Sequence, residues 1–246
     1  MVYTGSRRIK TFVEGLDDQI ESGIPVGTVN IISGTPGSMK SSLAYNILYY
    51  NALKIGLKCL YISMEQNVES LTAQMQRLGM KEKTNKLVVE DYTSLDKKLR
   101  GTKFQQKKFK HDWITRIKTY LEGLGSNRFD LMVLDSLDAL YALTTLENPR
   151  MELYYFFKTL RETETTSFLI SEMTQNTDKF SKFGVEEFLC DGIIHLDFKR
   201  TGTILSQLER FVGIVKLRNT NYTTQYFPIQ HQEGKFKILT GEDLEL

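Results

Sequence analysis

The stretch Thr28-Val-Asn-Ile-Ile-Ser33, followed directly by Gly34-Thr-Pro-Gly-Ser-Met-Lys40-Ser41, decides the fold of this chain. Its first part is a short apolar run with β-branched residues, which predicts a buried β-strand. Its second part carries glycines and leads into Lys40–Leu53, where apolar residues recur every three or four positions and predict a helix. A strand, a glycine-bearing turn and a helix in this order are the context that a phosphate-binding loop of the Walker A type requires.

Phosphate chemistry explains why these residue types occur together. Backbone N–H groups of a tight turn and of a helix N-terminus attract phosphate oxygens, and Gly34 and Gly37 let the backbone come close to them. Lys40 is then expected to bridge the β- and γ-phosphates, and the Ser41 hydroxyl to bind Mg²⁺. The expected nucleotide-binding residues of this stretch are Gly34, Thr35, Pro36, Gly37, Ser38, Met39, Lys40, Ser41 and Ser42. The alternative interpretation is an ordinary Gly-Ser turn before a basic helix.

Met39 departs from the Walker A pattern, because it stands where the second fixed glycine is expected. If that position needs a positive φ or a close approach to phosphate, a methionine there costs roughly 1–3 kcal/mol.

Four more apolar runs continue the strand pattern and alternate with helical patterns. The runs are Lys58–Ser63, Lys86–Glu90, Phe129–Leu134 and Ser167–Ser171, and the further helices are expected at Val68–Leu78, Asp112–Leu124 and Arg150–Glu164. Strands without in/out alternation, each followed by a helix, indicate a parallel sheet that is covered on both faces. The expected fold class is therefore α/β, with a mostly parallel, twisted sheet flanked by helices.

The pattern changes after Ser171. The polar stretch Gln175–Lys182 leads into three strand-like runs, Gly192–Phe198, Phe211–Leu217 and Lys235–Leu239, with no helical pattern between them. This arrangement predicts an antiparallel extension of the same sheet. No repeat or linker divides the chain, so residues 1–246 are interpreted as one domain.

Composition excludes several classes of protein. Lys and Arg number 32 and Asp and Glu number 30, so no overall field would hold the whole chain on nucleic acid or an anionic membrane. Two cysteines, Cys59 and Cys190, cannot form a disulfide framework and indicate free thiols in a reducing compartment. The N-terminus has no apolar signal region, and nowhere do eighteen apolar residues run together. We expect a soluble, cytoplasmic protein without a membrane partner.

Two carboxylates stand at the ends of predicted strands, where a parallel sheet binds its ligands. Glu65 follows the run Lys58–Ser63 and is placed to orient or deprotonate a water beside a γ-phosphate. Asp135 ends the apolar segment Phe129–Leu134, as in a Walker B strand, and is expected to hold Mg²⁺. Either residue alone can also be read as a helix-capping acid.

These segments resemble, in order, the KaiC-like branch of the RecA-type ATPases. Besides the loop, the resemblance rests on Gly15-Leu-Asp-Asp, Gly23-Ile-Pro-Val-Gly-Thr, Tyr61–Glu65, Asp135-Ser136, Gly184-Val-Glu-Glu-Phe-Leu-Cys-Asp191-Gly and Val215-Lys-Leu-Arg-Asn-Thr220. Walker motifs are common to many folds, whereas the Gly-Val-Glu-Glu-Phe and Lys-Leu-Arg-x-Thr segments are specific to KaiC-like domains. The resemblance implies a RecA-like core and covers nearly the whole chain.

The resemblance also implies a homohexameric ring with ATP and Mg²⁺ between neighbouring subunits. Lys216 and Arg218 match the pair that reaches the nucleotide of the adjacent subunit, and residues two apart on a strand point the same way. Leu217, Thr220 and Tyr222 lie on the same segment and are included in the expected nucleotide site. Without the resemblance, this segment would read as the charged, solvent-facing part of an edge strand.

Two further positions depart from the family pattern. Glu65 retains the expected base, but Gln66 replaces the second of two adjacent glutamates, and Tyr222 replaces a histidine. Together with Met39, these departures predict slow hydrolysis rather than loss of binding. They also leave open a scaffold that binds ATP without hydrolysing it.

Residues 96–112 form a basic insert, with seven cations against two aspartates. The cations are Lys97, Lys98, Arg100, Lys103, Lys107, Lys108 and Lys110. Such a patch is a candidate contact for nucleic-acid phosphates, as in a recombinase-like RecA paralogue, although a solvated insert has the same composition.

The leading hypothesis is a KaiC-like ATPase that binds Mg·ATP at subunit interfaces and hydrolyses it slowly to drive conformational change toward an unidentified protein client. In this hypothesis Glu65 is the base, Lys40 holds the phosphates, and Lys216 and Arg218 act from the next subunit.

Overall fold

The centre of the computed structural model is a parallel sheet. Its strands lie in the order β9 (Gly192–Thr201), β4 (Val29–Gly34), β8 (Thr166–Glu172), β7 (Leu131–Asp135), β5 (Cys59–Ser63) and β6 (Leu87–Asp91). β4, β5 and β7 are buried at every residue, which explains their unbroken apolar runs. The structure describes residues 7–99, 112–173, 179–201 and 207–241.

The other edge of the sheet is antiparallel, as the sequence predicted. β10 (Gln207–Leu217) pairs with β9, β11 (Tyr226–Gln232) with β10, and β12 (Lys235–Ile238) with β11, while the short β2 (Val13–Glu14) adds a parallel strand at the edge. The extension begins one strand later than expected, because Gly192–Phe198 belongs to β9, which is parallel to β4. β11 was not predicted.

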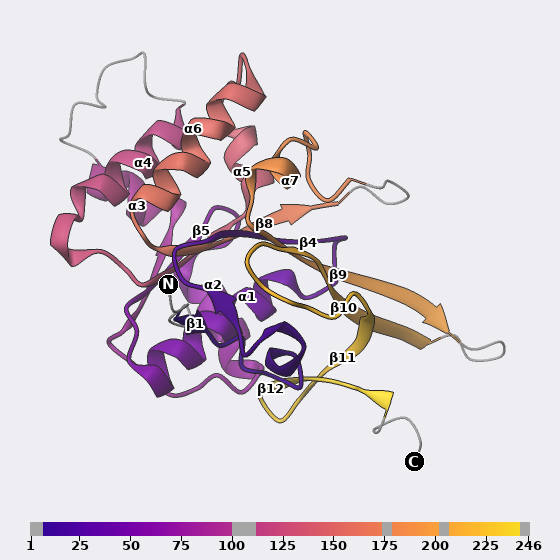
Figure 1. Cartoon of the computed structure of the whole chain (residues 1–246). Coiled ribbons are helices and arrows are strands. Elements are labelled where there is room, and N and C mark those ends of the chain that lie inside the picture. Colours follow the sequence, from indigo (N-terminus) through magenta and orange to yellow (C-terminus); the bar gives the residue numbers. More distant parts are fainter. Residues whose placement is uncertain (1–6, 100–111, 174–178, 202–206, 242–246) are drawn as a thin grey trace, which may run out of the picture.

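Helices cover both faces of this sheet (Figure 1). On one face lie α1 (Lys40–Tyr50), which continues as a π-helical turn over Asn51–Ile55, and α2 (Val68–Arg77). On the other lie α3 (Tyr92–Leu99), α4 (Trp113–Gly123), α5 (Leu137–Ala142), α6 (Pro149–Glu162) and the short α7 (Glu186–Leu189). α3, α5 and α7 were not predicted, whereas the others begin and end close to the expected residues.

Several short elements lie near the N-terminus, and one more follows α4. β1 (Arg8–Ile9) and β3 (Ile24–Pro25) form a separate two-stranded antiparallel sheet, and η1 (Asp17–Ile20) lies between them in sequence. A second 3-10 turn, η5 (Gly125–Asn127), follows α4. Within the described ranges, no helix combines the length and apolar character that a membrane span requires.

The topology brings polar and charged residues together at the carboxyl ends of the parallel strands. Gly34, Ser63, Asp135 and Glu172 are the last residues of four neighbouring parallel strands. Because parallel strands end at the same edge, their ends form the floor of a ligand site.

Candidate functional site

The loop between β4 and α1 depends on two glycines for different reasons. A Cβ on Gly34 would lie 2.3 Å from the Leu196 carbonyl oxygen, so no side chain fits between β4 and β9 there. Gly37 has a φ of +84° and open space around it, so its need is conformational. The Ser38 hydroxyl donates to the Thr35 carbonyl at 2.8 Å and closes the turn.

Met39 adopts the left-handed conformation that the glycine of the Walker A pattern would provide. Its φ is 72° and its ψ is 26°, directly before the first residue of α1. Its side chain is partly buried against the hydrophobic core below the loop. The backbone geometry of the loop is therefore kept with a residue for which it is unfavourable.

Lys40 is the first residue of α1, and its side chain is mostly buried at the floor of the site. Its ammonium group donates to the Thr35 carbonyl at 3.1 Å. Burial lowers the pKa of Lys40, and the negative charges of Glu172, Asp135 and Glu65 act in the opposite direction. Among the described residues, this lysine thus faces several carboxylates and hydrogen-bonds only to its own loop.

Asp135 ends β7 as a buried carboxylate. The Tyr61 hydroxyl donates to Asp135 Oδ2 at 2.5 Å, and Ser41 hydrogen-bonds to the same carboxylate. Burial raises the pKa of Asp135, and these hydrogen bonds reduce that effect. Asp135 and Ser41, the two residues expected to hold Mg²⁺, therefore lie side by side.

Glu65 follows β5 and is exposed at the mouth of the site. Its carboxylate accepts a hydrogen bond from the Ser136 hydroxyl, and the same hydroxyl accepts from the Ala139 N–H at the start of α5. Because Ser136 directly follows Asp135 in the sequence, this hydrogen bond fixes the orientation of Glu65 relative to Asp135.

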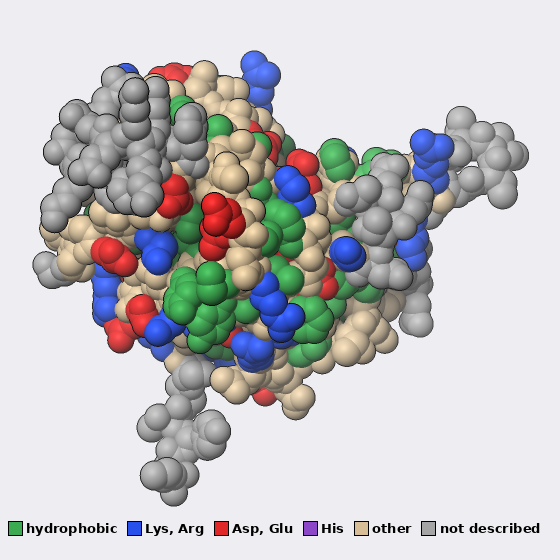
Figure 2. Space-filling model, turned by 90° about the horizontal axis from the view of Figure 1, so that it is seen from above, with side chains coloured by type: hydrophobic (Ala, Val, Ile, Leu, Met, Phe, Trp, Pro, Cys, Tyr) green, Lys and Arg blue, Asp and Glu red, His purple; other side chains and the backbone are tan. Residues whose placement is uncertain are grey.

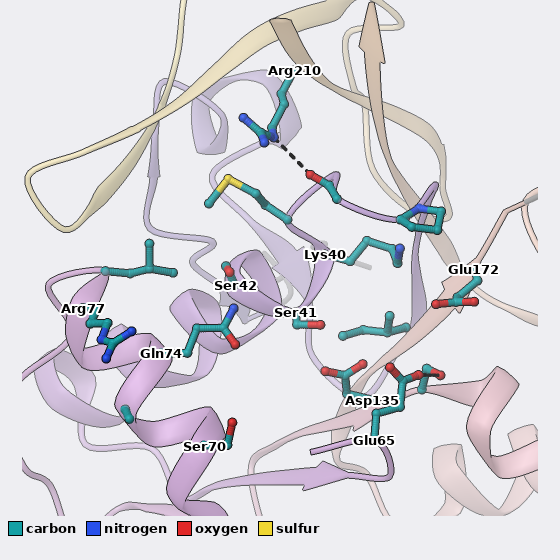
Figure 3. A pocket seen from close by; sticks show the side chains of 17 residues that line it. Lys40, Ser41, Ser42, Glu65, Ser70, Gln74, Arg77, Asp135, Glu172 and Arg210 are labelled. Carbon is teal, nitrogen blue, oxygen red and sulfur yellow. Dashed lines mark hydrogen bonds between the residues drawn. The ribbon is translucent and has the colours of Figure 1, made fainter. Parts of the chain in front are cut away.

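These residues surround one cavity of about 870 Å³ (Figure 3). Lys40, Ser41, Glu65, Asp135 and Glu172 lie around one end, and Ser70, Gln74 and Arg77 of α2 lie toward the other. The loop contributes Pro36, Gly37, Met39, Lys40, Ser41 and Ser42 to the wall. Gly34, Thr35 and Ser38 do not line this cavity and instead shape the turn. The volume suits a nucleotide-sized ligand.

The sequence analysis missed several residues of the cavity wall, among them Glu172 and Arg210. Glu172 is the last residue of β8, the same position that drew attention to Asp135, so the strand-end rule would have found it. Arg210 lies on β10, and its Nε donates to the Gly37 carbonyl at 3.2 Å. Nothing in the local sequence indicates this contact, because it joins residues 173 positions apart.

The donor set fits a magnesium ion that is shared with a phosphate chain. Within the described residues, no group of three or more His, Cys, Asp or Glu side chains is arranged to hold a metal alone. Mg²⁺ in nucleotide sites commonly uses one or two protein oxygens, completed by phosphate and water. Ser41 and Asp135 can provide those oxygens.

Lys216 and Arg218 lie together, but away from this cavity. The Lys216 ammonium donates to the carbonyls of Glu187 (2.8 Å) and Cys190 (2.7 Å). Arg218 Nη1 donates to Asp191 Oδ1 at 3.0 Å, and its Nη2 donates to the Phe188 carbonyl at 3.2 Å. We call the turn formed by residues 187–191 the cation cradle.

The other residues expected from this segment also lie outside the cavity wall that the described residues form. Leu217 is buried in the core, the Thr220 hydroxyl accepts from Arg8 at 2.8 Å, and the Tyr222 hydroxyl donates to the Val215 carbonyl at 3.2 Å. The segment thus forms no part of the wall of this cavity as the described residues define it.

An apolar surface adjoins the cation cradle. Its side chains are those of Met151, Tyr154 and Tyr155 on α6 and of Phe188 on α7, which is 71% exposed. Figure 2 looks onto the helices above the sheet and shows hydrophobic side chains gathered between basic ones on this side.

Only the beginning of the basic insert belongs to the described residues. Lys97 and Lys98 lie in the last turn of α3, where Lys98 forms an ion pair with Glu90. Arg100, Lys103, Lys107, Lys108 and Lys110 lie outside the described residues.

Comparison with known proteins shows the family of this chain. The family model "ATPase: KaiC" matches residues 9–243. The UPF0273 protein PH0284 of Pyrococcus horikoshii is 28% identical over 235 residues, which cover 91% of this chain and 90% of that protein.

Two further relatives extend the comparison. The circadian clock oscillator protein KaiC 1 of Synechocystis is 24% identical over 225 residues, and this chain spans 42% of its length. The crystal structure of the KaiC-like protein PH0186 of Pyrococcus horikoshii superimposes with a TM-score of 0.75 at 24% identity, covering 96% of this chain and all of that one. That structure has the same fold.

Proposed function

Because this chain belongs to the KaiC family of ATPases, we propose that it binds Mg·ATP in the cavity beside Lys40 and hydrolyses it slowly at interfaces between subunits. The observation that carries the proposal is the convergence of Lys40, Ser41, Asp135 and Glu65 from three different segments on one cavity. A chance Gly-Ser turn would not bring an acid from each of two other strand ends to its side.

Each residue has a chemical role in this proposal. Lys40 and the N–H groups of the loop neutralise the phosphate chain, and Ser41 and Asp135 hold Mg²⁺, which screens the charge that develops on the phosphates. Glu65, held by Ser136, orients the attacking water and accepts its proton. Met39 and Gln66 stand where the family pattern has a glycine and a second glutamate, and this supports a low rate.

The cation cradle supports a role for Lys216 and Arg218 on a neighbouring subunit. Neither side chain lines its own cavity, and Arg218 remains half exposed although it is paired with Asp191. An arginine supplied in trans to a phosphoryl-transfer site is worth about 10³–10⁵ in turnover. A homohexameric ring would place each cradle beside the next subunit's phosphates.

The experiment is phosphate release under steady-state conditions at saturating Mg·ATP, with the oligomeric state verified. Wild-type chains should turn over, while Lys40→Ala and Arg218→Ala chains should each be inactive. Mixed assemblies of the two variants should regain part of the activity, because some interfaces combine an intact loop with an intact arginine.

Two outcomes would contradict parts of the proposal. No recovery under conditions where subunits exchange would exclude the shared site. Binding of ATP without any phosphate release by a verified oligomer would favour an ATP-dependent scaffold over an enzyme.

A further inference from the structure

Glu172 is a cavity carboxylate that the proposed chemistry leaves without a role. It ends β8, and its backbone is fixed on both sides. The Glu172 N–H donates to Asp138 Oδ2 at 2.7 Å, and the next N–H, of Met173, donates to the Gly34 carbonyl at 3.0 Å. Glu172 is also the register partner of Gly34, so it lies directly beside the start of the phosphate loop.

The side chain of Glu172 differs from its acidic neighbours. Glu65 accepts a hydrogen bond from Ser136, and Asp135 accepts one from Tyr61. For the Glu172 carboxylate, the described part of the chain provides neither a hydrogen-bond donor nor an ion-pair partner. Among the described residues, only the backbone hydrogen bonds hold Glu172 in place, so its carboxylate can respond to a nearby charge.

Lys40 is the cation that this carboxylate faces (Figure 3). Both side chains line the same cavity, and Glu172 is the register partner of Gly34, where the loop that leads to Lys40 begins. In the absence of a ligand, Glu172 is thus a counter-charge for Lys40, although no ion pair forms between them.

A bound triphosphate would change this arrangement. Its terminal phosphates take the Lys40 ammonium, so two anions then share one cation in a partly water-excluded site. The repulsion grows with the negative charge near Lys40, and a triphosphate brings more of it there than a diphosphate does. We propose that Glu172 competes with the terminal phosphate for Lys40 and so weakens triphosphate binding relative to diphosphate binding. This inference rests on the proposed function of the cavity.

The test is calorimetric titration of the full-length chain with Mg·ADP and with the magnesium complex of a non-hydrolysable β,γ-imido triphosphate. Glu172→Gln, which removes the charge and keeps the shape, should bind the triphosphate about tenfold more tightly, a gain of about 1.4 kcal/mol. Its affinity for Mg·ADP should change by less than about threefold. Glu172→Ala should shift the ratio in the same direction.

Glu69→Gln is the matched control, because Glu69 is an exposed acid on α2 outside the cavity. It removes the same net charge and should leave both affinities unchanged. The proposal is overturned if Glu172→Gln changes both affinities equally or neither. It is also overturned if triphosphate binding weakens, because Glu172 would then help to hold the metal or an ordered water. If wild-type chains bind neither nucleotide, the proposed function itself fails.

Discussion

Lys40 and Lys216 are both lysines whose pKa is lowered by burial, yet the chain surrounds them in opposite ways. Within the described parts of the chain, Lys40 donates to one carbonyl, that of Thr35, and it lines a cavity with several carboxylates. Lys216 donates to two carbonyls of the cation cradle, and its neighbour Arg218 is paired with Asp191. Lys40 thus has hydrogen-bonding capacity left for a ligand, whereas Lys216 uses more of its capacity within the chain.

The difference between the two lysines matches the two roles that the proposed function gives them: Lys40 binds the ligand, and Lys216 acts on a neighbouring subunit. Groups that are to meet a ligand are left with part of their hydrogen-bonding capacity unused, because the ligand completes it. A group that is to reach across an interface must be oriented before the partner arrives, and a complete set of contacts does that. In the proposed function, the cation cradle therefore acts as a positioning device and the cavity acts as a receptor.

Asp191→Asn should disrupt the contacts that hold Arg218 in the cation cradle. Its expected effect on turnover is the largest of these predictions. Asp191 accepts from Arg161 Nε and Nη2, from Arg218 Nη1 and from the Val29 N–H, so an asparagine leaves donors unpaired. Turnover should fall about 10–100-fold, as for other residues that orient a functional group, with little change in KM. Unfolding should become easier by about 1–3 kcal/mol. Steady-state phosphate release and urea denaturation measure the two effects.

Asp130→Asn is the matched control, because Asp130 also directly precedes a parallel strand and accepts from a backbone N–H, that of Lys58, whereas Arg218 donates to Asp191. It should lower stability without lowering turnover. Combining Asp191→Asn with Arg218→Ala should cost no further activity beyond that of Arg218→Ala. A further loss in the double variant would show that Asp191 acts on something other than Arg218.

Asp135→Asn should test whether the buried charge of Asp135 destabilises the cavity when no ligand is bound. Burial raises the pKa of Asp135, so the stability contributed by its protonated form is present below the ordinary carboxyl pKa. That contribution is lost as pH rises through the raised folded-state pKa. The asparagine variant should therefore be more stable than wild type by about 1 kcal/mol near neutral pH, with the difference shrinking as pH falls.

The measurement is urea denaturation across a pH series without magnesium or nucleotide. Asp18→Asn changes an exposed carboxylate on the short helix η1 and should show no such trend. If Asp135→Asn is instead less stable at neutral pH, then the hydrogen bonds from Tyr61 and Ser41 outweigh the cost of burying the charge.

The sequence predicted the centre of the parallel core because β4, β5 and β7 are short, largely apolar runs that are buried at every residue. β11 escaped prediction because Tyr226–Gln232 is mixed in polarity and contains Pro228, and only its alternate residues Phe227 and Ile229 are buried. α5 and α7 are too short for a helical period to show. These elements depend on their neighbours more than on their own residues.

The candidate site divides in the same way. The loop, Glu65 and Asp135 follow from motifs that lie at strand ends, where local sequence and topology agree. Arg210 reaches Gly37 across 173 residues, and the pairing of Arg218 with Asp191 joins residues 27 positions apart. Such contacts depend on strand order in the antiparallel extension, which hydrophobic pattern alone does not specify.

Met39→Gly should test how much the left-handed backbone of Met39 destabilises the loop beside the cavity. Its expected effect on the free energy of unfolding is the smallest of these predictions. Glycine relieves a left-handed backbone that costs another residue about 1 kcal/mol. It also loses the packing of Met39 on the core and adds freedom to the unfolded chain, so the net change should stay below about 1 kcal/mol. Met39→Val, β-branched at the same positive φ, should destabilise by about 2 kcal/mol or more. Equal losses for glycine and valine in thermal unfolding would show that side-chain packing, and not backbone conformation, determines which residue this loop accepts.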